Sequence, residues 1–410
     1  MRRATAIAAT LLLILATFAG SPAVDGYAVD TTAPTGGGCP ALDRWNLSVS
    51  QPLNRRWSTS LPLAPVTVLT IAAQNSSAQL TEIEQTITAA FGVWSGVTGT
   101  TFNAANYPGM IGPLTRVTTA SACTNDAGTN VDGLNTICFN QSSTAFTAGV
   151  LAFTRVITAN APGVSVGSGP PAAFAGQILD ADTLFLNNGQ ATYATPGALS
   201  TPQGQGAYDL ESLLIHELGH WFGFDHSAVW RAIMFPYAPP PGTFLGSRPT
   251  AQQPDAPLSD DDRTGIRMLY PDPNDSVDIG AIRGRVLPAN PFALALLPQP
   301  YAGSSVTGLY GAHVVAVDAD TGAVIAGVFS GWSCNAANPA ATPQFDGSYD
   351  FERLPVGHNY WIYAEPLVGL AQPSDFTDAL ETACSASSTS PCTPPAVNTN
   401  FNPRALPAGP

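Results

Sequence analysis

The chain has 410 residues, 45% of them hydrophobic, which is enough apolar material for two or three domains of ordinary size. Its formal net charge is −14 with only 11% charged residues, which argues against nucleic acid as a partner, because phosphate binding needs clustered cations. All 15 basic residues are arginine, which excludes Schiff-base chemistry and the phosphate-binding P-loop, since both need a lysine amine.

The first 23 residues have the pattern of a signal peptide. The sequence MRR precedes an apolar run over residues 4–19, and SPA follows it as a small-residue cleavage site. A membrane anchor is the alternative, but this run of 16 residues is shorter than the roughly 20 that span a bilayer. We therefore expect cleavage near Ala23, a secreted or periplasmic protein and no membrane anchor in the mature chain. Residues 24–42 are expected to be a linker or a short pro-segment.

Six cysteines in an exported chain favour disulfides. Cys123 and Cys138 flank a turn-rich segment, and a bond between them closes a loop of about 15 residues, which stabilises by about 3 kcal/mol in the chain-entropy model. The sequence leaves open how the others pair: Cys39, Cys334, Cys384 and Cys392.

Residues 43–272 show strands followed by helices, which predicts one α/β (α+β) domain with three helices. A capping box at Thr81–Glu84 precedes apolar residues at helical spacing. Asp209 is a good N-cap for a second helix, and Ser259 with Asp262 caps a third that ends before Pro271. Strands are expected at residues 62–73, 135–139, 150–157 and 178–186.

After a linker at residues 273–277 the helical periodicity disappears. Five short β-rich runs alternate with turns, which predicts a small β-sandwich over residues 278–405.

The segment HELGHWFGFDH, residues 216–226, holds three of the five histidines. His216 and His220 are four residues apart, so a helix presents both on one face. His226 can be a third zinc ligand if the chain turns between them, and Gly223 permits the left-handed conformation that such a turn needs.

Glu217 lies next to the first ligand and can take a proton from a zinc-bound water as the water attacks a carbonyl. A bare HExxH also occurs by chance, but the longer HExxHxxGxxH fixes five residues over eleven positions, and ordinary buried histidines do not explain it.

This segment resembles the zinc signature of the metzincin endopeptidases, and the serine after His226 resembles the matrixin branch. Met234 resembles the Met-turn of that family. LSDDDRTGIRMLYP, TEIEQTITAAFGVWSGVTGTTF and ILDADTLFLNN resemble the matrixin closing helix, first helix and the strand before the active-site helix. The resemblance covers about residues 43–272 and implies a twisted mixed sheet and a catalytic zinc.

The departures from the family also matter. Animal matrixins hold a second zinc through further histidines; here Phe153 stands at one such position, so the resemblance implies one zinc only. Leu151 and Ala152 belong to the edge strand that binds extended substrate in the family. The family's latency peptide is missing; Cys39 is either a zinc-blocking thiolate or a disulfide partner.

Acidic residues offer further candidates. Asp180 and Asp182 are possible calcium ligands, with a solvated strand end as the alternative. Asp261 and Asp262 are expected to brace the loop below the zinc, and Tyr237 to line the pocket for the substrate residue after the cut.

DGSYDFERLPVGHNYWIYAEP resembles the carboxypeptidase regulatory-like, transthyretin-like sandwich, a likeness of fold more than of function. His313 and His358 are read as ordinary sandwich residues. The sequence as a whole predicts a secreted, monomeric zinc endopeptidase acting on protein or peptide substrates. The alternative is a non-catalytic adhesion or binding protein, against which the intact Glu217 argues.

Overall fold

The structure is a computed structural model. It describes residues 29–32, 41–49, 53–58, 67–117, 132–141, 149–167, 169–186, 191–243, 256–275, 279–288, 307–309, 311–331, 346–367, 371 and 375–376. The predicted signal peptide lies outside these residues. Within the described ranges, no helix is both long and apolar enough to cross a bilayer.

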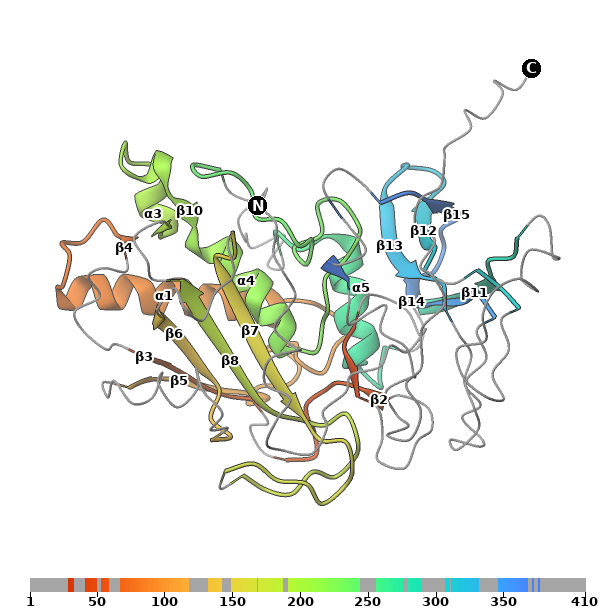
Figure 1. The fold of residues 1–410 in the computed structure, drawn as a ribbon, viewed down its shortest axis with the longest axis horizontal. Coiled ribbons are helices and arrows are strands. Elements are labelled where there is room, and N and C mark those ends of the chain that lie inside the picture. The colour runs from red at the N-terminus through yellow and green to blue at the C-terminus, as the bar shows by residue number, and fades with distance from the viewer. Residues whose placement is uncertain are drawn as a thin grey trace.

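The first part of the chain forms a mixed five-stranded sheet (Figure 1). Neighbouring strands are parallel except the edge strand β7, which runs antiparallel to β8. The order across the sheet is β5 (Ile111–Val117), β3 (Leu53–Ser58), β6 (Thr136–Gln141), β8 (Ile178–Leu186) and β7 (Ala152–Thr158). The three strands expected for β6, β7 and β8 are confirmed within two residues, whereas β3 and β5 were not predicted.

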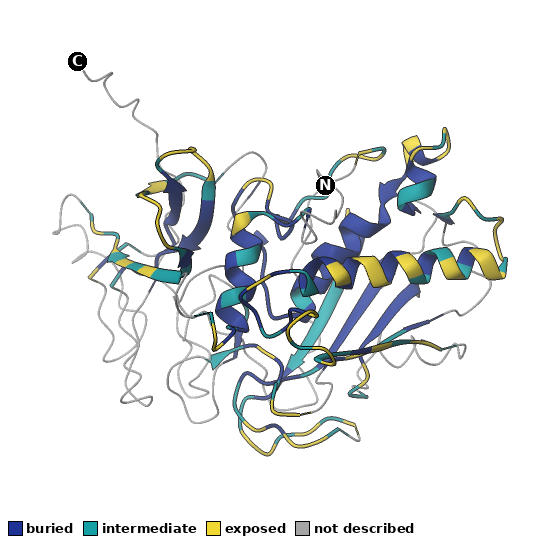
Figure 2. Ribbon diagram, turned by 180° about the vertical axis from the view of Figure 1, so that it is seen from behind, coloured by how far each residue is buried: buried dark blue, intermediate teal, exposed yellow. Residues whose placement is uncertain are grey.

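Two helices cover one face of this sheet, α1 (Ser77–Ser95) and α4 (Leu210–Trp221) (Figures 1 and 2). The expected capping box at Thr81 is wrong, because α1 begins a turn earlier. Ser76 is the N-cap and accepts from the Gln79 amide, while the Thr81 hydroxyl donates to the Ser77 carbonyl inside the helix. The N-cap of α4 is Asp209, as predicted, and its carboxylate accepts from the Glu211 amide.

Smaller elements surround this core. The predicted strand at residues 62–73 contains β4, but β4 belongs to a separate three-stranded sheet and not to the main one. Two short paired strands lie within residues 24–42, the segment expected to be a linker or a short pro-segment. The bounds are β1 (Thr31–Thr32), β2 (Ala41–Leu42), β4 (Thr67–Leu69), β9 (Thr192–Ala194), α3 (Pro196–Leu199), the 3-10 helix η2 (Gly204–Gly206) and β10 (Tyr208–Asp209).

Helix α5 (Asp260–Leu269) has the predicted capping box of Ser259 and Asp262 and joins the two parts of the molecule. It packs against β13 and β14 of the C-terminal strands (Figure 1). All five predicted β runs contain strands: β11 (Ile279–Arg285) with β14 (Ser348–Pro355), and β13 (Val324–Phe329) with β12 (His313–Asp318) and β15 (Tyr360–Glu365). A transthyretin-like sandwich remains a prediction.

Candidate metal centre

Three imidazoles converge where α4 ends. His216 and His220 lie one turn apart on α4, and His226 follows after the chain has turned back. Their candidate ligand atoms all lie within 4.8 Å of one another. His216 and His226 are buried, and His220 is partly exposed. Zinc bound by nitrogen at about 2.0–2.1 Å needs donors gathered in this way, so the residues fit the ion that the sequence predicts.

Each imidazole forms a hydrogen bond through its Nδ1 with a backbone carbonyl oxygen. Such a carbonyl accepts only from a protonated Nδ1, which leaves Nε2 with the lone pair that binds a metal. The three pairs are His216 with the Ile233 oxygen (2.7 Å), His220 with the Phe224 oxygen (2.7 Å) and His226 with the Asp375 oxygen (2.8 Å). The Asp375 carbonyl is a functional group that the sequence did not reveal.

The turn between the second and third ligands depends on Gly223. Its φ is +93°, a left-handed conformation that favours glycine. A Cβ at this position would also overlap the Asp43 carbonyl oxygen. The hinge predicted from the sequence is therefore present, and it is fixed by both conformation and space.

Met234 lies directly beneath the site and is 1% exposed. Gly219 makes room for it, since a Cβ there would overlap the Met234 sulfur. The Asp262 carboxylate accepts from the amides of Ile233 (2.8 Å) and Met234 (3.3 Å), and burial raises the pKa of Asp262. The Met-turn role of Met234 stays a prediction. Gly219 was missed, although its position between the two helical ligands was a possible signal.

Asp261 connects the loop after the third ligand to the C-terminal strands. Its carboxylate accepts from the Ser227 hydroxyl and from the Gly327 amide on β13, both at 2.7 Å. Burial, reinforced by the negative charge of Asp262, raises the pKa of Asp261 to about 7. Both aspartates thus brace the backbone around the site, as expected.

Glu217 lies on α4 next to His216 and is 1% exposed. Its Oε2 accepts a hydrogen bond of 3.0 Å from the hydroxyl of Thr154 on β7. The carboxylate is thereby held against β7, on the helix that carries His216 and His220.

A mainly apolar cavity of about 400 Å³ opens beside His216. Tyr237 lines it, together with Leu213, Trp230 and Phe235, and donates its hydroxyl to the Asp375 carboxylate at 3.0 Å. Leu151 and Ala152 are not among its lining residues.

Leu151 and Ala152 instead mark the start of the edge strand. The Leu151 carbonyl accepts from the Leu186 amide and the Tyr193 hydroxyl, both at 2.8 Å, and Ala152 pairs with Phe185. Since β7 ends the sheet order, its outer side is the side on which an added strand would pair. A substrate role for these two residues remains a prediction.

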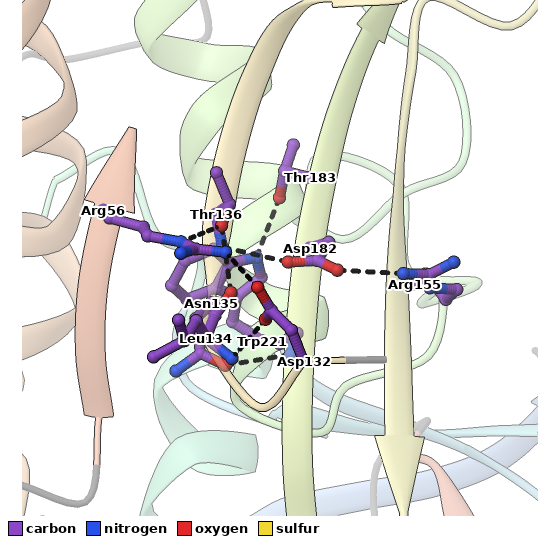
Figure 3. Close-up of polar contacts among 10 residues, drawn as sticks. Arg56, Asp132, Leu134, Asn135, Thr136, Arg155, Asp182, Thr183 and Trp221 are labelled. Carbon is purple, nitrogen blue, oxygen red and sulfur yellow. Dashed lines mark hydrogen bonds and ion pairs between the residues drawn. The ribbon is translucent and has the colours of Figure 1, made fainter. Parts of the chain in front are cut away.

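Asp180 and Asp182 are both 0% exposed, so the solvated strand end considered as their alternative is wrong. Asp182 forms an ion pair with Arg155 (2.9 Å) and accepts from the Thr136 amide (3.0 Å), as Figure 3 shows. Among the described residues, the three histidines form the one group of His, Cys, Asp or Glu close enough together for an ion. Calcium binding remains a prediction.

Cys138 is buried and disulfide-bonded. Its predicted partner, Cys123, lies outside the described residues, as does Cys39, and the pairing stays a prediction.

Comparison with known proteins gives two matches. The matrixin family model matches residues 169–271. A segment of 91 residues is 35% identical to metalloendoproteinase 1 of Glycine max, and covers 22% of this chain and 24% of that protein. The chain thus matches about a quarter of the length of this curated relative. Both matches support a matrixin-like metallopeptidase, and zinc fits the three histidines.

Proposed function

We propose that this chain is a secreted zinc endopeptidase that hydrolyses peptide bonds in extended protein substrates. The observation that supports this most is the set of three imidazoles, each fixed through Nδ1 by a carbonyl, with Glu217 on the helix that carries two of them. A mere structural cluster of histidines would not need one ligand atom of each ring to lie within 4.8 Å of the other two.

His216, His220 and His226 would hold the zinc ion. When bound, zinc lowers the pKa of a water molecule to about 7 and polarises a carbonyl group. Glu217 then takes a proton from the attacking water and returns it to the leaving amine. The outer side of β7 pairs with an extended peptide backbone, and the apolar cavity beside His216 takes one substrate side chain.

The competing proposal is a binding protein that keeps the fold without the reaction. Glu217 argues against it, because replacing this carboxylate is the simplest way to lose water activation, and here it is present, buried and hydrogen-bonded.

The first prediction tests the reaction itself. Purified protein should degrade unfolded casein, a metal chelator should abolish the activity, and added zinc should restore it. Glu217→Ala should lower the rate by about 100- to 10,000-fold, because general acid–base catalysis contributes on that order.

The zinc content of Glu217→Ala should match that of the wild type, since Glu217 is not a proposed ligand. Equal activity in the mutant would refute the mechanism, and a zinc-loaded wild type inactive on every unfolded protein would favour the binding protein. Mass spectrometry of the exported protein, with an N-terminus following Ala23, would support secretion.

A further inference from the structure

A chain of hydroxyl groups leads from the interior of the sheet to Glu217. Thr154 on β7 and Thr183 on β8 are directly opposite each other in the antiparallel pair, and their hydroxyl oxygens are 2.8 Å apart. Beyond Thr183, the indole nitrogen of Trp221 lies 2.8 Å from the Thr183 hydroxyl (Figure 3). At the other end, the Thr154 hydroxyl lies 3.0 Å from Glu217 Oε2 and 3.1 Å from the Glu217 carbonyl oxygen.

The direction of this chain follows from the number of protons available. The Trp221 indole nitrogen can only donate, so Thr183 accepts from it. A hydroxyl carries one proton, and the hydrogen-bond acceptor that Thr183 has for it is Thr154. Thr154 must then give its own proton to Glu217. Each group therefore donates to the next: Trp221 to Thr183, Thr183 to Thr154, and Thr154 to Glu217.

The two contacts of Thr154 with Glu217 fix the side chain relative to its own backbone. A single hydroxyl within 3.0 and 3.1 Å of the carboxylate and the carbonyl of one residue restricts how that carboxylate can turn. Trp221 and Thr183 are both 0% exposed, so the far end of the chain is enclosed by other protein atoms. A hydrogen bond to a carboxylate is also among the stronger ones.

We propose that Thr154 is a positioning residue for Glu217, and that Thr183 and Trp221 orient its hydroxyl. This rests on the proposed function, since it assigns the residue that holds the general base. Thr154 touches neither substrate nor metal in this role. Its hydroxyl aims the Glu217 carboxylate at the attacking water, and a misplacement of about 1 Å can cost about 100-fold in rate.

The test compares Thr154→Val, which keeps the shape and removes the hydroxyl, with Thr154→Ser, which keeps the hydroxyl. In zinc-loaded protein with peptide substrate, Thr154→Val should lower kcat by about 10- to 100-fold and leave KM within about twofold. Thr154→Ser should stay within about threefold of the wild type. Trp221→Phe, which removes the terminal donor, should have a smaller effect of the same kind. Zinc content and Tm are measured for each variant.

Crystal structures of the zinc-loaded wild type and Thr154→Val supply a measurement that needs no activity. The Glu217 carboxylate should turn away from its wild-type position in Thr154→Val and return in Thr154→Ser. The proposal is overturned if Thr154→Val has the wild-type kcat, if Thr154→Ser is as impaired as Thr154→Val, or if the carboxylate does not move. An inactive zinc-loaded wild type would refute the proposed function and the positioning role with it, whereas an active wild type with an unchanged kcat in Thr154→Val would refute the positioning role alone.

Discussion

At the scale of single residues, two glycines do what no other residue could do at the metal centre. Gly219 leaves space for the Met234 sulfur beneath α4, and Gly223 turns the chain from His220 toward His226. The geometry of the zinc ligands therefore depends on these two glycines, which have no Cβ, as well as on the imidazoles.

The second prediction concerns Gly223. Gly223→Ala should destabilise the protein by about 2–4 kcal/mol, because a side chain is strained at φ +93° and its Cβ would overlap the Asp43 carbonyl. Denaturant unfolding of the zinc-loaded protein measures this. Gly92→Ala is the matched control: Gly92 is exposed within α1 with no atom near its Cβ position, so the substitution should stabilise by about 0.5–1 kcal/mol. Equal effects at the two positions would contradict the hinge.

The residues of the candidate site could be predicted to different extents. His216, Glu217 and His220 were accessible because helical periodicity is local, and Gly223 because a turn needs it. The Asp375 carbonyl could not be predicted, because every residue has a carbonyl and this one is 149 positions from His226. Thr154 was hidden in the same way, since only the pairing of β7 with β8 and the packing of α4 bring it to Glu217.

At the scale of elements, strand β3 could not be predicted because its sequence lacks the alternation typical of a strand. Its centre is Arg55–Arg56, which breaks the apolar alternation expected of a strand. In the structure Arg55 lies over the Phe91 ring, 4.5 Å from its centroid, and burial lowers its pKa to about 10. Its Nε also donates to the Gly112 carbonyl at 2.7 Å, so tertiary contacts that the local sequence pattern does not show accommodate the arginine there.

The segment around Asp375 acts as an element of the metal centre. Phe376 is fully buried against Phe329 of β13, in a cluster that includes Ala228 and Phe235 from the loop after His226. Because Phe376 anchors this segment, it also holds the Asp375 carbonyl against His226. The geometry of the third ligand, His226, therefore depends on Phe376, which lies 150 positions further along the chain.

The third prediction follows from that anchor. Phe376→Ala should weaken zinc binding by about 10- to 100-fold, the usual cost of losing a group that orients a ligand, and should lower stability by about 3–5 kcal/mol. Competition with a chelating dye measures the zinc affinity. Phe351→Ala is the control, because Phe351 is equally buried but lies on β14 next to Tyr349. It should lower stability to a similar extent and leave zinc affinity unchanged; a loss of affinity in both would argue for a general effect of destabilisation.

At the scale of the whole molecule, the two parts share one hydrophobic core. Phe224 and Ile266 belong to the same buried cluster as Val314, Ala326 and Phe351 of the C-terminal strands. The hydrogen bond from the Gly327 amide on β13 to the Asp261 carboxylate crosses the same boundary. The C-terminal strands therefore pack against the part of the chain that carries the metal centre, with β13 bonded to it through Gly327, which the division predicted at residues 273–277 did not suggest.

His313 lies at this junction and is 1% exposed. It belongs to β12, and a Cβ on Gly327 would meet both its ring and Val229 of the loop after His226. The Glu365 carboxylate is 3.5 Å from its Nδ1. Burial lowers the pKa of His313 from 6.5 to about 4, so the imidazole is neutral in the folded protein at pH values where the unfolded chain already binds a proton.

The fourth prediction is a loss of stability in mild acid. Between pH 6.5 and 4, His313 binds more protons in the unfolded state than in the folded state. The free energy of unfolding is therefore highest above pH 6.5 and falls by about 3 kcal/mol in total as the pH approaches 4. Asp261 acts in the opposite sense, because its raised pKa contributes stability at low pH that is lost as the pH rises through about 7. Comparing variants with the wild type therefore separates the two residues.

Denaturant unfolding of metal-free protein at pH 7.5 and pH 4.5 provides the measurement. Relative to the wild type, His313→Leu should gain stability on acidification, and Asp261→Asn should lose it. Because the core is continuous, the wild type should unfold in one transition at both pH values. If the free energy of unfolding had the same pH dependence in the wild type and in His313→Leu, His313 would not be buried in neutral form. Two separate unfolding transitions would show that the C-terminal strands are independent of the metal centre.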